Sequence, residues 1–146
     1  MIKLFIAAAF FAGAMALAPS PGEASEPAQL MAGDPSGAHV AFSFSAKDLR
    51  IETHQVGNPG AKLSIWIDHS RRRLFSRILT ADDCKFGDDG ARCRLVFTRQ
   101  SPGYSLFLAA FRRGRTAHVE VENAAVMQMS QDLSLIGFAR KVRSET

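Results

Sequence analysis

The chain contains two cysteines, Cys84 and Cys93, and their spacing limits the chemistry open to them. Eight residues separate the two cysteines, so they do not form the CxxC motif of thioredoxin-like redox sites. Two thiolates also fall short of a zinc site, which needs two further ligands at recognisable spacing. The intervening KFGDDGAR places glycines around paired aspartates, which is typical of a turn. We therefore expect a structural disulfide across the base of a hairpin.

A second group of potential ligands alternates with apolar residues between positions 116 and 122. His118, Glu120 and Glu122 would share the outer face of one strand there. Side chains along one face of a strand point in parallel and do not converge on one ion. A fourth ligand, His54 or His39, would have to come from another strand. We favour the polar face of a half-buried strand and keep as the alternative function a periplasmic metal-handling or envelope-stress accessory protein.

Two further motifs contain the residue types of reactive sites without their arrangement. Met127 and Met129 offer soft thioethers for copper(I), but copper sites generally gather more Met, His or Cys, so packing is the simpler interpretation. Asp68-His69-Ser70 contains the residue types of a catalytic triad. Triad members are brought together by the fold and the nucleophile sits on a GxSxG-type turn, which this chain lacks. A hairpin turn is expected at this position, and the sequence predicts neither an enzyme nor a cofactor site.

The charged residues are unevenly distributed and predominantly basic. The chain has a formal net charge of +4 and an isoelectric point near 9.5. Arginines cluster in several places, and two clusters are the candidate binding residues: Arg71, Arg72, Arg73, Arg112, Arg113 and Arg115. Such clusters suit an anionic envelope component or an acidic protein face, although they are also compatible with an ordinary solvated surface. No nucleic-acid-binding signature accompanies them, so nucleic acid is not the expected partner.

The amino terminus predicts export. Lys3 precedes an apolar run from Leu4 to Ala18 that is shorter than the roughly 20 residues of a membrane span, and a zone of small residues follows. We expect a signal peptide over residues 1–24, with a preferred cut after Ala24, and a flexible leader over residues 25–37. No later apolar run is long enough to be a transmembrane segment. The predicted location is periplasmic or secreted, where a cysteine pair persists as a disulfide.

The remaining residues, 38–146, predict one β-rich domain. Alternating apolar residues indicate strands near residues 40–44, 49–51, 63–67, 74–79, 92–98, 116–122 and 133–138. The period changes after Ser101-Pro102, where a helix is expected over 102–113 with Leu106, Phe107 and Phe111 among its inward residues and Gly114 as its stop. The fold class is mainly β (a β-rich α+β arrangement). We predict a small antiparallel sandwich or barrel-like domain with one short helix and one disulfide.

The carboxy-terminal half, about 80 residues long, resembles the invasion-associated locus B family of exported bacterial β-rich proteins. The resembling features are LSIWID, the cysteine pair, FRRGRTAHVEV and LSLIGFARKV. This chain departs from the family in the wider spacing of its cysteines and in lacking a larger amino-terminal portion with a second cysteine pair. The resemblance implies a periplasmic or surface-associated protein linked to host-cell interaction and virulence, without an assigned reaction. We expect an exported protein that acts by binding and not by catalysis.

Overall fold

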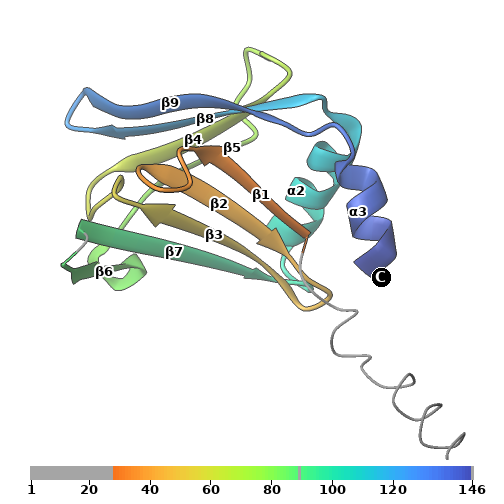
Figure 1. Cartoon of the computed structure of the whole chain (residues 1–146), viewed down its shortest axis with the longest axis horizontal. Helices are drawn as coiled ribbons and strands as arrows, with labels where there is room; N and C mark the ends of the chain where they lie inside the picture. Colours follow the sequence, from red (N-terminus) through yellow and green to blue (C-terminus); the bar gives the residue numbers. More distant parts are fainter. Residues whose placement is uncertain (1–27, 89, 146) are drawn as a thin grey trace, which may run out of the picture.

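The computed structural model describes residues 28–88 and 90–145, and their alternating apolar positions build two antiparallel sheets (Figure 1). The first sheet has five strands in the order β1-β2-β3-β7-β6. Their bounds are β1 Ala28–Gly33, β2 His39–Phe44, β3 Asp48–His54, β7 Gly90–Thr98 and β6 Cys84–Gly87.

The second sheet has four strands in the order β5-β4-β8-β9. Their bounds are β5 Phe75–Ile78, β4 Lys62–Ile67, β8 Thr116–Asn123 and β9 Val126–Ser134. A short 3₁₀ helix, η2 (Ala81–Asp83), leads from β5 into β6 and so from the second sheet back to the first. The two sheets face one another, and the edge strands β1 and β9 come together along one side (Figure 1).

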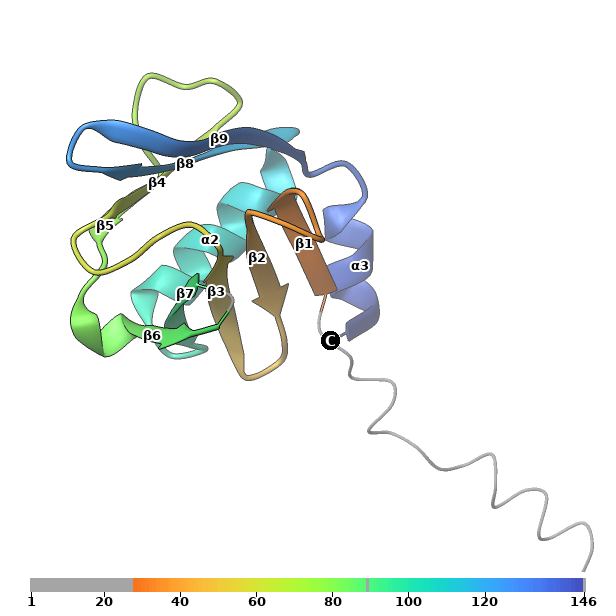
Figure 2. The same ribbon diagram turned by 60° about the vertical axis from the view of Figure 1, so that its left-hand side comes forward.

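Helix α2 (Pro102–Arg113) runs along the side of the sandwich between the sheets (Figure 2). Its Phe107 and Phe111 side chains are fully buried. The Phe107 ring lies 5.2 Å from the ring of Phe75 in the second sheet and 5.7 Å from that of Phe97 in the first. Edge-to-face and tilted aromatic pairs at such distances add to the stability gained from burying their area. The helix therefore joins the two sheets through one aromatic cluster.

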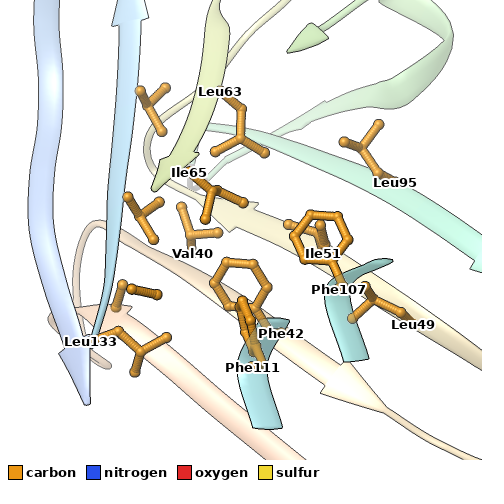
Figure 3. Close-up of a cluster of buried hydrophobic side chains, with 14 of the residues drawn as sticks. Val40, Phe42, Leu49, Ile51, Leu63, Ile65, Leu95, Phe107, Phe111 and Leu133 are labelled. Carbon is orange, nitrogen blue, oxygen red and sulfur yellow. The ribbon is translucent and has the colours of Figure 1, made fainter. Parts of the chain in front are cut away.

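The core between the sheets consists of the inward residues of alternating strands. Val40 and Phe42 of β2 face Leu63 and Ile65 of β4, and all four are fully buried (Figure 3). One cluster contains the core residues of both sheets, as expected when each sheet hides one apolar face against the other. The predicted class, mainly β with two antiparallel layers, is confirmed.

Both ends of α2 follow the sequence signals. The hydroxyl of Ser101 accepts a hydrogen bond from the Gly103 N–H (3.2 Å), and Pro102 takes the first helical position. Gly114 ends the helix at a φ of −80°, so a left-handed backbone is not the reason for a glycine there. A Cβ atom at position 114 would lie 2.6 Å from Ile67 Cγ2. This glycine is needed for close packing of the helix end against β4.

The structure differs from the sequence prediction at the beginning of the domain. Residues 28–33 of the expected flexible leader form strand β1, which pairs along its length with β2. Ala28 and Ala32 are buried, because small side chains fit where this edge of the first sheet meets β9. Long-range pairing thus orders a segment whose composition alone favours disorder. The predicted signal peptide and residues 25–27 lie outside the described part of the chain.

The predicted last strand, residues 133–138, is also wrong beyond its first two residues. Strand β9 stops at Ser134, whose hydroxyl accepts a hydrogen bond from the Ile136 N–H (3.3 Å). Gly137 has a φ of +89°, which turns the chain into helix α3 (Phe138–Glu145). Phe138 is fully buried against Phe44, with ring centroids 4.9 Å apart. Its buried apolar side chain therefore packs from the first residue of a helix and not from a strand.

None of the helices described is both long and apolar enough to cross a membrane.

Candidate functional site

The structure brings the two predicted arginine clusters to the same end of the second sheet. Strand β4 ends at Ile67, and the neighbouring strand β8 begins at Thr116. The Asp68 N–H donates to the Thr116 carbonyl (2.8 Å), and one carboxylate oxygen of Asp68 accepts from the N–H groups of Arg115 (2.8 Å) and Thr116 (2.9 Å). The loop carrying the first cluster is thus tied to the helix end carrying the second.

We call this surface the arginine end, and all six of its arginines are exposed. They are Arg71, Arg72 and Arg73 in the β4–β5 loop, Arg112 and Arg113 at the end of α2, and Arg115 before β8. The loop projects beyond both sheets (Figure 1). It leaves β4 through Asp68 and His69, which both have positive φ values (52° and 56°). The expected hairpin turn at Asp68-His69-Ser70 is confirmed.

The segments that carry the six arginines contain few acidic residues. Residues 69–81 and 99–119 contain no Asp or Glu. The nearest carboxylate in sequence, Asp68, has a pKa below its usual range because it accepts hydrogen bonds from the Arg115 and Thr116 backbone N–H groups. It therefore stays ionised, but its charge is directed at backbone dipoles. Exposed arginines gathered at one end of the sheet form a surface that attracts anions.

Trp66 supports the arginine loop from the outer face of the second sheet. The Arg73 guanidinium lies over the Trp66 indole, with its central carbon 5.5 Å from the ring centroid, within cation–π range. On the other side, Trp66 is the cross-strand partner of His118, and the two ring centroids are 5.8 Å apart. The chain of contacts from Arg73 through Trp66 to His118 therefore spans the loop, β4 and β8.

His118 is held between two carboxylates. Its Nδ1 lies 2.7 Å from Asp132 Oδ1, and its Nε2 lies 2.9 Å from Glu120 Oε2 and 3.1 Å from the Ser130 hydroxyl. Partial burial lowers the pKa of His118, but hydrogen bonds and charge attraction from Asp132 and Glu120 outweigh it, so the pKa is raised. The imidazolium can donate one proton to each carboxylate.

This geometry does not favour the metal-handling interpretation. Glu120 and Asp132 occupy opposite ring nitrogens of His118, so their oxygens cannot converge with the imidazole on one ion. The suggested fourth ligands, His39 and His54, stack on each other in the first sheet, with ring centroids 4.6 Å apart. Within residues 28–88 and 90–145, no group of three His, Cys, Asp or Glu is arranged to hold a metal.

The two methionines do not form a shared site either. Met129 is 6% exposed and Met127 is 45% exposed, although alternate residues of a strand normally share one face. An irregularity in the pairing of β8 with β9, between Val121 and Glu122, shifts the register there. The alternation of faces therefore fails locally, and the two thioethers lie in different environments, Met129 packed and Met127 exposed.

The cysteines form the predicted disulfide across the base of a hairpin. Cys84 and Cys93 are direct cross-strand partners on β6 and β7, and they form a buried disulfide. The Cys93 N–H donates to the Thr53 hydroxyl at 3.0 Å. Next to the disulfide, the Asp83 carboxylate forms an ion pair with Arg77 (3.1 Å) and accepts a hydrogen bond from the Thr80 N–H (2.9 Å). These contacts assign the disulfide and Asp83 to the framework and not to a reactive site.

No protein-family model, curated protein or solved structure matches this chain. The candidate site therefore rests on its own geometry.

The sequence pointed to the arginines and His118 but not to three of their neighbours. Asp132 lies opposite His118 on β9, and only the register of β8 with β9 brings them together. Trp66 lies on β4, and its contact with Arg73 depends on the course of the loop. Leu106, predicted to face inward, is 49% exposed. Its neighbour Phe107 takes the core position instead.

Proposed function

We propose that this chain is an exported, non-catalytic binding protein of the bacterial envelope that binds anionic partners through the arginine end. The observation that carries the proposal is the junction at Asp68, which holds both arginine clusters at one end of the sheet. Six exposed guanidinium groups in one place provide the donors for phosphate, sulfate or carboxylate groups.

Three further features support the exported location and the class of protein. A signal-peptide-like amino terminus and a disulfide both suit an oxidising compartment such as the periplasm or the exterior. The resemblance of the carboxy-terminal half to the invasion-associated locus B family agrees with an envelope protein associated with host interaction. Metal handling is the alternative function, but no contact described above favours it.

Binding to immobilised heparin, a soluble anionic polysaccharide, tests the proposal. The variant carrying Arg71→Glu, Arg72→Glu and Arg73→Glu should elute at much lower salt than the wild type, because each arginine contact to an anion is weakened by screening and lost on charge reversal. The control variant carries Lys47→Glu and Lys85→Glu, two exposed lysines outside the arginine end. Equal elution of the wild type and the arginine variant would contradict the proposal.

A further inference from the structure

A hollow separates the arginine loop from helix α2, and its lining is both basic and apolar. Arg72 and Arg73 line it together with apolar side chains, which are those of Ile67, Leu74, Leu106 and Ala110. Its volume is about 310 Å³, at the lower end of small-molecule sites. An apolar lining next to two arginines suits a ligand with an anionic head and a hydrocarbon chain.

Leu106 gives this hollow an apolar side chain that the fold does not need for its own core. The next residue, Phe107, is fully buried, whereas Leu106 is 49% exposed on the outer side of the same helix. It lies one helical turn before Ala110, so both side chains fall on the face that the arginine loop approaches. The helix therefore offers an aliphatic surface next to Arg72 and Arg73.

A second exposed aliphatic side chain belongs to the same end of the molecule. Ile136 is 82% exposed, the highest value among the large apolar residues described. It follows Leu135, whose N–H donates to the Arg115 carbonyl at 2.8 Å. Leu135 Cδ1 would also lie 3.2 Å from a Cβ atom at position 114, next to the helix end. Ile136 is thus held beside Arg115 in the turn between β9 and α3.

We propose that the arginine end docks on the surface of an anionic phospholipid bilayer, with Leu106 and Ile136 entering the boundary between headgroups and acyl chains. The inference rests on the proposed function and names its partner. Charge complementarity identifies the occupant, because the arginines match lipid phosphates and the segments that carry them, 69–81 and 99–119, contain no Asp or Glu. A soluble polyanion would use the arginines but would gain nothing from the exposed leucine and isoleucine. Peripheral membrane proteins combine both kinds of contact.

Vesicle sedimentation with the disulfide-bonded protein tests the inference. The probe vesicles contain phosphatidylcholine with about 30 mol% phosphatidylglycerol, and the reference vesicles contain phosphatidylcholine alone. We expect the wild type to sediment with the anionic vesicles only. Replacing both Leu106→Ser and Ile136→Ser should weaken this binding about tenfold or more without changing the net charge.

A matched control replaces two exposed aliphatic residues outside the arginine end, Ile78→Ser and Val126→Ser, which are 61% and 64% exposed. This control should bind the vesicles as the wild type does. Trp66, the single tryptophan, lies under Arg73 and provides a second readout. Bromine-labelled acyl chains should quench its fluorescence in the wild type and much less in the Leu106/Ile136 variant.

The outcomes separate the inference from the proposed function. Binding to heparin without binding to anionic vesicles would overturn the bilayer inference and leave an anionic polysaccharide or acidic protein as the partner. Vesicle binding that is unaffected by the Leu106/Ile136 replacements would also overturn it, since only the arginines would then be engaged. If the wild type binds neither heparin nor anionic vesicles, the proposed function itself is overturned.

Discussion

The Asp68 carboxylate lies 2.8 Å from the Arg115 backbone nitrogen, and this hydrogen bond joins two segments 47 residues apart in the sequence. The same oxygen accepts from the Thr116 N–H. Through these bonds a single side chain holds the arginine loop and the end of α2 together. The Asp68 side chain thus adds to the β4–β8 pairing in holding the six arginines at one end of the sheet.

Replacing Asp68 should affect both stability and binding. In Asp68→Ala the Arg115 and Thr116 N–H groups lose their side-chain acceptor, so we expect the melting temperature to fall by a few degrees and heparin elution to shift to lower salt. Asp68→Asn keeps an oxygen that can accept and should retain most of both properties. Thermal unfolding followed by circular dichroism and heparin chromatography give the two readouts. An alanine variant with unchanged elution would show that the junction does not organise the arginines.

The raised pKa of His118 predicts a pH-dependent contribution to stability. The charged imidazolium is favoured in the folded state by Asp132 and Glu120, so its folded pKa exceeds the unfolded value of about 6.5. Its stabilising contribution is fully present below the unfolded pKa and is lost as the pH rises through the folded pKa. We expect the melting temperature of the wild type to fall more than that of His118→Gln across this window.

Titration of the His118 ring by NMR checks this prediction directly. The midpoint should lie above that of a histidine in the denatured protein, and Asp132→Asn should lower it by removing one negative charge. A midpoint at or below the denatured value would contradict the arrangement of His118 between two carboxylates.

The disulfide should contribute to the stability of the fold and not to anion binding. Closing the short loop between Cys84 and Cys93 lowers the entropy of the unfolded chain, and the loop-entropy relation gives about 2.5–3 kcal/mol. We expect the double variant Cys84→Ala/Cys93→Ala to lose about that much free energy of unfolding in urea titrations, with heparin affinity preserved. A loss of heparin binding by the folded variant would assign the cysteines a functional role.

Truncation of two adjacent helix residues should change the stability by very different amounts. Phe107→Ala removes a fully buried ring in contact with Phe75 and Phe97 and should cost about 3–5 kcal/mol of unfolding free energy. Leu106→Ala removes a half-exposed side chain and should change stability by less than about 0.5–1 kcal/mol. Urea unfolding of both variants tests the placement of α2. A large loss for Leu106→Ala would mean that its side chain is part of the core.

Local sequence patterns predicted the strands and the helix that form in the same way whichever element packs against them. Period-two alternation identified β2, β4 and β8, because one face of each strand is buried whatever its neighbour. The Ser101-Pro102 signal and the spacing of Phe107 and Phe111 located α2 at its observed bounds. Turn residues between the cysteines predicted the hairpin.

Long-range contacts determine the features of the fold and of the site that local sequence patterns did not predict. The alanines of β1 are weak strand formers, and only pairing with β2 makes a strand of them. The end of β9 depends on the turn at Gly137, which an apolar run through Phe138 conceals. At the candidate site, the sequence showed the two arginine clusters. It did not show that both lie at the same end of the second sheet, because this depends on β4 lying beside β8 and on the Asp68 hydrogen bonds.

The most direct test of the central claim is an NMR titration of the ¹⁵N-labelled protein with a heparin tetrasaccharide. The account predicts saturable shifts confined to the β4–β5 loop at 68–74 and to residues 112–116, with a smaller effect at Trp66. Shifts centred on the β6–β7 hairpin or on the tip of β8 and β9, with the arginine end unaffected, would contradict it.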